Sequence, residues 1–256
     1  MRALNRKMVA DMKYEVHIHR HGCPICGCVS SLPYKDTRWC ECLSCGLVYL
    51  DRFSRLPEVD DLLHGRQHHF FEDKKIEDFK ERFDVKRKGF ENRLNLYLQF
   101  VNFHDKNLKV CEVGFGGGIL LKLLLERGYT NVYGIEVVER YCQHARGIGV
   151  PTFWADLSNQ SQSHLVINHA FDLVIGNEMM EHVESPVDFM KGVRRITKEG
   201  GHAVFSFAVP DGRKRLSGSE WQYARESSIK KLVELSGWNM EHFKISSTTA
   251  FAWLVK

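Results

Sequence analysis

Lys109-Val-Cys-Glu-Val-Gly-Phe-Gly-Gly-Gly118 gives the strongest indication of how this chain folds. Its short apolar run ends in glycines and leads at once into ILLKLLLERG (119–128), whose apolar residues recur at helical spacing. The pattern predicts a buried strand, a glycine-rich turn and an amphipathic helix. In a doubly wound α/β fold, such a turn places a ligand at the carboxyl end of the strand.

A second apolar run, Asn131–Glu136, predicts the next strand and ends in a carboxylate 24 residues after Glu112. An acidic side chain at this place can accept hydrogen bonds from both ribose hydroxyls of a nucleoside. A dinucleotide-binding turn of the form G-x-G-x-x-G needs a glycine where this chain has Ile119. The turn reads E-x-G-x-G-x-G instead. Bare backbone there admits a bulky uncharged group, and Glu112 can hold an ammonium, which favours S-adenosylmethionine over NAD.

Further segments follow in order, so that residues 108–256 resemble a class I S-adenosylmethionine-dependent methyltransferase. The segments are A-D-L at 155–157, F-D-L-V-I-G-N at 171–177, E-H-V at 181–183 and K-E-G-G at 198–201, where Glu199 replaces the family's usual proline. The resemblance implies a Rossmann-like α/β fold with a seven-stranded, mostly parallel sheet. It also implies a helix over 221–238 and two closing antiparallel strands.

The same resemblance implies which residues bind the cofactor. Asp156 follows the third strand, where the family's acidic residue contacts the adenine amino group, and Asn177 ends the fourth strand. The full predicted set is Glu112, Gly114, Phe115, Gly116, Gly118, Glu136, Val137, Asp156, Leu157 and Asn177.

Acid–base residues near the carboxyl ends of the fourth and fifth strands are the candidates for catalysis, because an oxygen or carbon acceptor can require a general base. His182 is the first candidate, and the others are Glu181, Asp211 and Tyr223. The alternative for His182 is a capping and packing role, which an E-H-V segment often gives its histidine.

Glu178, Glu181 and His182 suggest a second kind of site, a divalent metal centre. On a helix, the spacing i, i+3 and i+4 places all three side chains on one face, where they could hold Mg²⁺ or another divalent ion. The motif is similar to the metal-binding motif of small-RNA 2′-O-methyltransferases and some ubiquinone-pathway O-methyltransferases. Those RNA enzymes add a downstream histidine, whereas residues 217–223 of this chain contain none. That departure disfavours a catalytic metal.

Six of the eight cysteines lie between residues 23 and 45, in a chain whose composition is that of a cytosolic protein. Two C-x2-C pairs are separated by fifteen residues, a spacing typical of four thiolates that close on Zn²⁺. The predicted ligands are Cys23, Cys26, Cys42 and Cys45. Cys28, Cys40 and His21 stay open as replacements. Because four thiolates leave no position for a catalytic water, the expected role of the zinc is structural.

These patterns divide the chain into a zinc-ribbon-like module at 16–50, a helical linker at 51–90 and a methyltransferase domain at 91–256, whose first helix is expected over 90–103. The module with its aromatic-rich linker resembles a bacterial subgroup of the family whose members often modify sugars, polyketides or other small metabolites. Within the linker, His64, His68 and His69 are interpreted as a helix surface, because no cysteine or carboxylate spacing supports a metal site.

Net charge and the length of the apolar runs disfavour a nucleic-acid-binding protein and a membrane-spanning protein. The chain has 256 residues and a net charge of 36 − 32 = +4, too small an excess to imply nucleic acid, and no apolar run reaches the roughly 18 residues of a membrane helix. The N-terminal residues have no secretory signal pattern, which predicts a cytoplasmic protein. The cations 213–215, in the loop after the fifth strand, either select an anionic acceptor or form a solvated surface.

Three functions therefore stay open. A small-molecule methyltransferase, acting on a sugar, a nucleotide-sugar or another metabolite, is favoured. An RNA methyltransferase is the first alternative, because some ribosomal-RNA enzymes also combine a zinc module with this fold. A cofactor-binding interaction protein without catalysis is the second, and the intact Glu112, Gly114, Gly116 and Glu136 argue against it.

Overall fold

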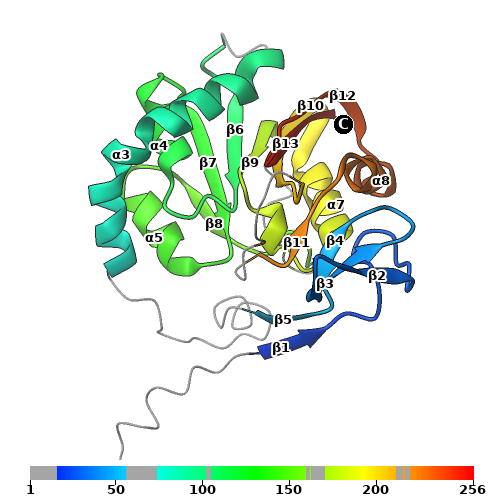
Figure 1. The fold of residues 1–256 in the computed structure, drawn as a ribbon. Helices are drawn as coiled ribbons and strands as arrows, with labels where there is room; N and C mark the ends of the chain where they lie inside the picture. Colours follow the sequence, from blue (N-terminus) through cyan, green and yellow to red (C-terminus); the bar gives the residue numbers. More distant parts are fainter. Residues whose placement is uncertain are drawn as a thin grey trace, which may run out of the picture.

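A seven-stranded mixed sheet forms the centre of the computed structural model, which describes residues 16–55, 74–101, 105–159, 162, 171–211, 216 and 220–256 (Figure 1). The strands, in the spatial order β12-β13-β10-β9-β6-β7-β8, are β12 (Asn239–Ile245), β13 (Thr249–Val255), β10 (Thr197–Ala208), β9 (Phe171–Gly176), β6 (Lys109–Val113), β7 (Asn131–Glu136) and β8 (Thr152–Trp154). Neighbours from β10 to β8 pair in parallel, and β13 is antiparallel to both β10 and β12. The predicted Rossmann-like α/β fold with a seven-stranded, mostly parallel sheet is confirmed.

The order of the strands reverses at β6, which has β7 on one side and β9 on the other. In open α/β sheets, the loops that leave such a switch point separate and leave a crevice at the carboxyl ends of the strands. The glycine turn after β6 and the acidic residue at the end of β7 therefore lie at the position where this fold binds ligands.

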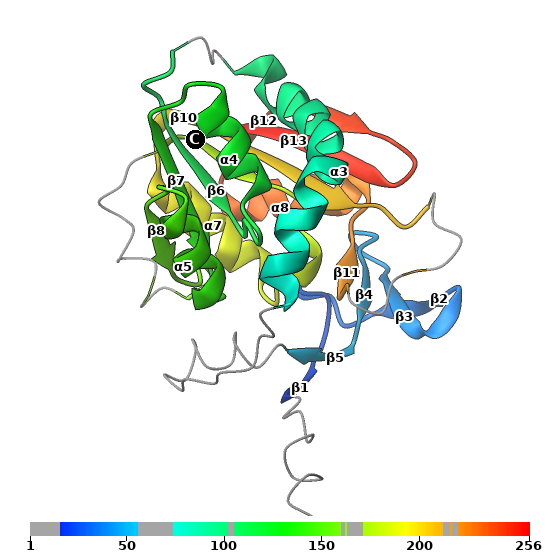
Figure 2. The same cartoon turned by 90° about the vertical axis from the view of Figure 1, so that its left-hand side faces the viewer.

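Helices cover both faces of this sheet (Figures 1 and 2). One face is covered by α3 (Lys74–Tyr97), α4 (Ile119–Glu126) and α5 (Glu139–Gly147), and the other by α7 (Pro186–Ile196) and α8 (Glu226–Ser236). Two apolar clusters correspond to the two faces, one with side chains of α3, α4 and α5 and one with side chains of α7 and α8. At the end of α3, the indole Nε1 of Trp253 donates to the carbonyl of Tyr97 at 3.0 Å, which attaches this helix to β13.

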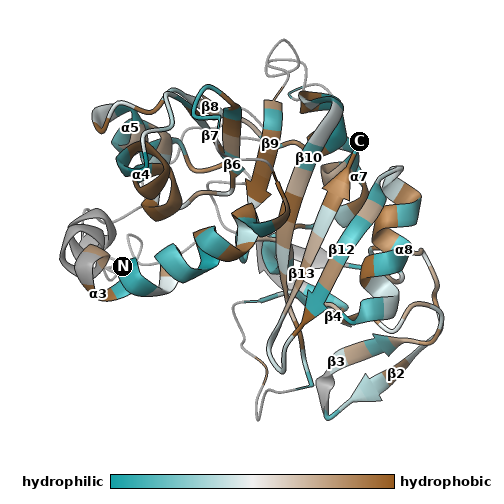
Figure 3. Cartoon of the chain, turned by 90° about the horizontal axis from the view of Figure 1, so that it is seen from above, coloured by the Kyte–Doolittle hydropathy of each residue, from teal (hydrophilic) through white to brown (hydrophobic). Residues whose placement is uncertain are grey.

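The apolar residues concentrate on the central strands (Figure 3). Five of the six residues of β9 are buried, whereas β12, at the edge of the sheet, has no fully buried residue. A strand with sheet neighbours on both sides and helices on both faces must be apolar almost throughout. The core therefore lies beneath the switch point, where it holds the ends of β6, β7 and β9 in place.

The N-terminal residues form a second, smaller sheet with the order β11-β4-β3-β2. Its strands are β2 (Ser31–Tyr34), β3 (Asp36–Cys42), β4 (Val48–Leu50) and β11 (Gln222–Tyr223). A separate two-stranded sheet pairs β1 (Val16–His19) with β5 (Arg52–Arg55). Because β11 comes from the chain between β10 and α8, the N-terminal module and the main domain share one sheet (Figure 2).

Two helices differ from the expectations. The helix expected over 90–103 begins earlier, since α3 runs without a break from Lys74 to Tyr97 and is followed by the 3-10 turn η1 (Leu98–Phe100). The expected boundary at residue 90 thus falls inside a helix, and β5 occupies part of the expected helical linker. The helix expected over 221–238 begins only at Glu226, because Gln222 and Tyr223 pair with β4 of the module.

Some expectations concern residues outside the described ranges, namely His64, His68, His69 and the cations 213–215. Among the helices that are described, none combines the length and the apolar character needed to cross a bilayer.

The contact between α7 and the loop after β8 leaves no room for a side chain at Gly192, where an added Cβ would overlap the carbonyl oxygen of Leu157. We expect Gly192→Ala to lower the free energy of unfolding by about 1–3 kcal/mol, the usual cost of overpacking. Gly147→Ala, in α5, is the matched control, because nothing lies within 4 Å of the added Cβ. Urea denaturation of the two variants measures the difference, and equal stabilities would contradict the packing described here.

Candidate functional site

The turn between β6 and α4 has the geometry that its glycines predict. Gly114, Gly116 and Gly118 have φ values of 64°, 51° and 76°, in the left-handed region that side chains disfavour. An added Cβ at Gly114 would lie 3.0 Å from the Cβ of Met179, so the turn touches the loop after β9 there. At Gly116 nothing lies within 4 Å, and its bare backbone borders open space.

Glu136, at the end of β7, is hydrogen bonded to this turn. Its Oε2 accepts from the backbone N–H of Gly116 at 2.9 Å, and its Oε1 accepts from Val137 at 2.8 Å and from Val138 at 3.2 Å. Burial raises the pKa of this carboxyl, and the three amides oppose that rise. A carboxylate has about four lone-pair sites, so it retains capacity to accept from further donors such as ribose hydroxyls.

Glu112, inside β6, is a buried carboxyl that lacks a donor for one oxygen. It is 3% exposed, and its Oε2 receives no hydrogen bond in the described part of the chain. Burial raises the pKa of Glu112 well above its usual range. A buried acceptor without a partner costs about 1–3 kcal/mol, and a cationic ligand would remove that cost. The residues present therefore fit the ammonium of S-adenosylmethionine.

The side chains or carbonyls of other residues predicted to bind the cofactor mainly pack in the core or stabilise local turns. The ring of Phe115 packs in the core, and a Cβ added at Gly134 would lie 2.6 Å from that ring. Leu157 is 1% exposed. The carboxylate of Asp156 accepts from the N–H and the hydroxyl of Ser158, at 2.8 and 2.6 Å, and so closes the turn after β8. The carbonyl of Val137 accepts from the indole of Trp154 at 2.8 Å.

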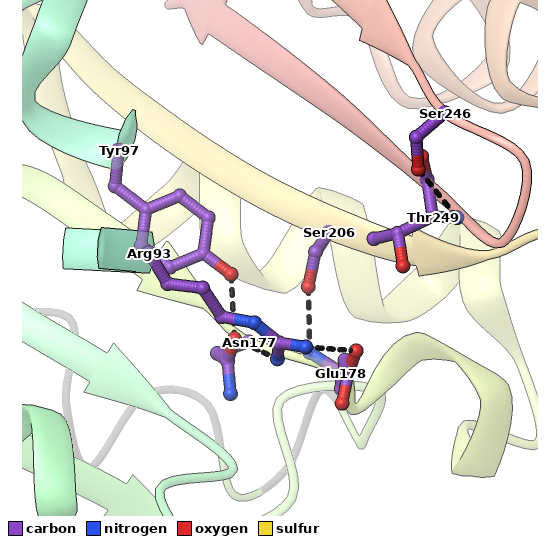
Figure 4. Close-up of polar contacts among 7 residues, drawn as sticks. All are labelled: Arg93, Tyr97, Asn177, Glu178, Ser206, Ser246 and Thr249. Carbon is purple, nitrogen blue, oxygen red and sulfur yellow. Dashed lines mark hydrogen bonds and ion pairs between the residues drawn. The ribbon is translucent and has the colours of Figure 1, made fainter. Parts of the chain in front are cut away.

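Asn177, after β9, is held by two side chains of α3 (Figure 4). Its Oδ1 accepts from the hydroxyl of Tyr97 at 2.6 Å and from Arg93 Nη1 at 3.0 Å. Arg93 Nη2 also pairs with the carboxylate of Glu178 at 2.6 Å. Burial raises the pKa of Tyr97, which keeps its hydroxyl a donor. Sequence reasoning missed Arg93 and Tyr97; their i, i+4 spacing marks a shared helix face but not what that face meets.

The divalent site that Glu178, Glu181 and His182 suggested, and that the missing downstream histidine disfavoured, lacks the helix on which its geometry relied. Glu178 has φ = 46°, and its N–H donates to Ser206 Oγ at 2.8 Å, so no helix runs through the motif. Only the 3-10 turn η2 (Met180–His182) follows. Among the described residues, the four cysteines are the only group that brings three or more metal-ligating side chains within 4.8 Å. The helical spacing on which the prediction relied is absent here.

The predicted catalytic residues occupy different surroundings. His182 is exposed, with its ring edge-on to Trp221 at 6.3 Å between centroids, whereas Glu181 is buried. Asp211 pairs with Arg225 at 3.1 Å. Tyr223 is fully buried on β11, where it donates to Glu220 and packs edge-on against Trp39 of the module. Of these residues, His182 alone presents an exposed base on the turn that follows β9.

Four cysteines of the module converge as their spacing predicts. Sγ atoms are 3.5 Å apart in the pair Cys23–Cys45 and 3.5 Å apart in the pair Cys26–Cys42. A tetrahedron with metal–sulfur bonds of about 2.3 Å has sulfur–sulfur edges of about 3.8 Å, so the cluster has the size of a zinc site. Cys28, whose thiol donates to the carbonyl of Ser30, stays outside the cluster.

The two knuckles that carry these thiols have the same backbone. Gly27 and Gly46 follow the pairs with φ values of 71° and 72°, and each N–H donates at 2.9 Å to the carbonyl of the first cysteine of its pair. Burial raises the pKa of Cys42 to about 11, whereas a hydrogen bond from Cys45 lowers the pKa of Cys23 to about 5. Cys40 also stays outside the cluster.

Comparison with known proteins places this geometry in a family. The model of a family described as "Methyltransferase domain" matches residues 64–256. The ubiquinone biosynthesis O-methyltransferase of Neisseria meningitidis serogroup C is 31% identical over 117 residues, which cover 43% of this chain and 49% of that protein. The protein of the same name from Acinetobacter baylyi is 34% identical over 118 residues, with 43% and 49% covered. The chain thus spans about half the length of these relatives.

Solved structures share the fold. A SAM-dependent methyltransferase from Archaeoglobus fulgidus matches with a TM-score of 0.55 at 16% identity, over 70% of this chain and 98% of that one. Magnesium protoporphyrin IX methyltransferase from Synechocystis, with bound SAH, matches with a TM-score of 0.52 at 16% identity, over 77% and 93%. At such identities the likeness concerns the fold.

The buried carboxyl of Glu112 gives the stability of the ligand-free protein a pH dependence. Because its pKa in the folded state is raised above the unfolded value of about 4.3, folding takes up a proton, and the free energy of unfolding falls as the pH rises above that value. The pKa of Glu136 is also raised by burial, so this residue too lowers the free energy of unfolding as the pH rises. We expect Glu112→Gln to flatten the dependence and to be more stable than the unaltered chain at about pH 8.

Urea denaturation at about pH 5.5 and about pH 8, both above the unfolded value, measures the effect. Glu199→Gln is the control, since the Glu199 side chain is 82% exposed and should leave the profile unchanged. Parallel profiles for Glu112→Gln and the unaltered chain would show that Glu112 does not titrate as its burial requires.

Proposed function

The chain belongs to the methyltransferase-domain family, and on that premise we propose that it transfers the methyl group of S-adenosylmethionine to a small-molecule acceptor. One observation carries the proposal: two buried carboxyls, Glu112 and Glu136, flank a glycine turn with open backbone. Glu112 would hold the ammonium of the cofactor, and Glu136 would accept from its ribose hydroxyls. Asp156 and Asn177 complete the predicted site beside the adenine and beyond β9.

When bound, the cofactor supplies a methyl group on a sulfonium sulfur, which departs as a neutral thioether. The contribution of this chain is therefore alignment of the acceptor and exclusion of water. Asn177 is well suited to positioning, because two donors from α3 fix its Oδ1 and thereby the direction of its amide group. Glu178, paired with Arg93, is held in its left-handed conformation and keeps the loop after β9 in one shape.

An oxygen acceptor is the best supported class, because the relatives found by sequence are named O-methyltransferases. An alcohol or phenol must lose its proton as the new oxygen–carbon bond forms. We assign this proton to His182, an exposed imidazole on η2, since the hydroxyl of Tyr223 is buried and donates to Glu220. The acceptor would enter over the carboxyl ends of β9 and β10.

The cysteine cluster belongs to the same proposal as a structural zinc site. Cys23, Cys26, Cys42 and Cys45 fit the ion in number, in chemistry and in the size of the cluster. With four thiolates, the site offers no place for a reacting group. Its expected contribution is the folding free energy of a module that is too short to bury a core of its own.

The cofactor assignment is tested by calorimetric titration of the chain with S-adenosylhomocysteine, with NAD as the competing ligand. Glu136→Ala removes the acceptor for the ribose hydroxyls, and charge-assisted hydrogen bonds contribute about 1.5–3 kcal/mol each, so we expect binding to weaken by about 100-fold. Glu199→Ala is the control, and far-UV circular dichroism verifies that both variants fold. Unchanged affinity in Glu136→Ala, or equal binding of NAD, would rule out the assignment.

The zinc assignment predicts one zinc per chain in purified protein, measured by elemental analysis. Cys42→Ser removes a ligand inside the cluster and should lose the metal, whereas Cys40→Ser, two residues away and outside the cluster, should keep it. Retention of full zinc by Cys42→Ser would contradict the ligand set.

A further inference from the structure

The turn 180–184, which carries His182, is held by the N-terminal module rather than by the strands of its own domain alone. Arg20, just before the first knuckle, donates from Nη2 to the carbonyl of Glu184 at 3.1 Å and to that of Val183 at 3.4 Å. Its Nη1 reaches the carbonyl of Trp221 at 3.5 Å. Burial lowers the pKa of Arg20 to about 10, so the guanidinium stays charged at neutral pH.

Strand β11 makes a second connection to the same turn. Gln222 Nε2 donates to the carbonyl of Met180 at 2.7 Å and to that of Val183 at 3.0 Å. The N–H of Trp221 donates to the carbonyl of Glu181 at 2.8 Å. The carbonyls of Glu181 and Val183 thus gain donors from β11 and the residue before it, and the carbonyl of Met180 gains a second donor beside the N–H of Val183.

β11 is in turn held by the cysteine module. It pairs with β4, and the N–H of Leu50 donates to the carbonyl of Trp221 at 2.9 Å. At the metal cluster itself, the carbonyl of Cys45 accepts from Ser227 Oγ at 2.8 Å. Hydrogen bonds therefore lead from β3, which ends at Cys42 of the second knuckle, to β4, from β4 to β11, and from β11 to the turn that bears His182.

Apolar side chains of the two parts pack together at this seam, around a small pocket. A cavity of about 20 Å³ lies between Ile25 and Leu47 of the module and Met180 and Phe207 of the main domain, with Gln222 in its wall. Gln222 Oε1 is buried and receives no hydrogen bond within the described residues. The position of the turn is therefore set by the hydrogen bonds above together with the apolar contacts of Met180 and Val183 in the shared core.

We propose that the metal-loaded cysteine module is a positioning element of the acceptor side of the site. It fixes β11 and the turn 180–184, and through them the place of His182, whereas Glu112 and Glu136 are set by β6, β7 and the glycine turn. Loss of the metal then loosens the acceptor side and leaves cofactor binding intact. The inference rests on the proposed function, because it assigns His182 to the acceptor and a metal to the cysteines.

Hydrogen–deuterium exchange of the whole chain, with and without its metal, tests this coupling. After chelation, amides in 180–184 and 220–224 should exchange at least about tenfold faster, since the contacts that order them are lost. Amides in 112–118 should exchange as before, and the affinity for S-adenosylhomocysteine should change by less than about twofold. Unchanged exchange in 180–184 and 220–224, or equal acceleration in 112–118, would overturn the proposal.

A second pair of variants tests the connection with the metal in place. Arg20→Met removes the donors to Val183 and Glu184, whereas Arg52→Met removes an exposed arginine of β5, just outside the module, and is the matched control. Faster exchange in 180–184 for Arg20→Met alone, with zinc content unchanged, supports the proposal, and equal exchange in both variants refutes it. Failure of the unaltered chain to bind S-adenosylhomocysteine would instead refute the proposed function, so the two failures are distinguishable.

Discussion

The hydrogen bond from the N–H of Gly116 to the carboxylate of Glu136 is the interaction on which the site depends. It joins the loops that leave two neighbouring parallel strands and closes them around a buried charge. The constraint explains why the turn must be glycine-rich, because only left-handed backbone directs the amide toward β7. It also explains why Gly134 faces the ring of Phe115: the turn presses that ring onto β7, and a side chain at Gly134 would occupy its place. The proposed cofactor site and the core packing here share the same few residues.

The cofactor side and the acceptor side of the site depend on different kinds of contact. On the cofactor side, the carboxylate of Glu136 accepts from backbone amides of the turn after β6 and of the residues after β7, so the geometry is set by the ends of two neighbouring strands. On the acceptor side, side chains from distant parts of the chain meet: Arg93 and Tyr97 from α3, Ser206 from β10, and Arg20 and Gln222 around η2. A cofactor common to a family calls for a rigid, sheet-determined pocket. The acceptor side, built from long-range contacts, can change with its substrate without disturbing the sheet.

This division decides how much could be predicted from the sequence. Strand, turn and acid at 109–118 and 131–136 are local patterns, and so are the paired cysteines, whose spacing alone identified the four that converge. The expectations that failed concern contacts between residues that are far apart in the sequence. The residues around Glu178 predict a helix. In the structure its N–H donates to the hydroxyl of Ser206, and its backbone is left-handed. Tyr223, a catalytic candidate, was expected in a helix. It lies instead in β11, which pairs with β4 more than 170 residues away, and its side chain is buried. The residues around Glu178 and Tyr223 do not indicate that Ser206 and β4 are their partners.

Strand β11 also imposes an order on biosynthesis. The last cysteine of the cluster is residue 45 and the strand that completes its sheet begins at residue 222, so translation must add 222 − 45 = 177 residues after Cys45 to reach that strand. At ribosomal rates of about 5–20 residues per second, that interval is roughly 10–35 seconds. With zinc bound as proposed, the four thiols can take up the ion long before β11 pairs with β4, and that edge of the sheet stays open until then. The proposed metal site and the completed sheet would therefore form at successive stages of synthesis.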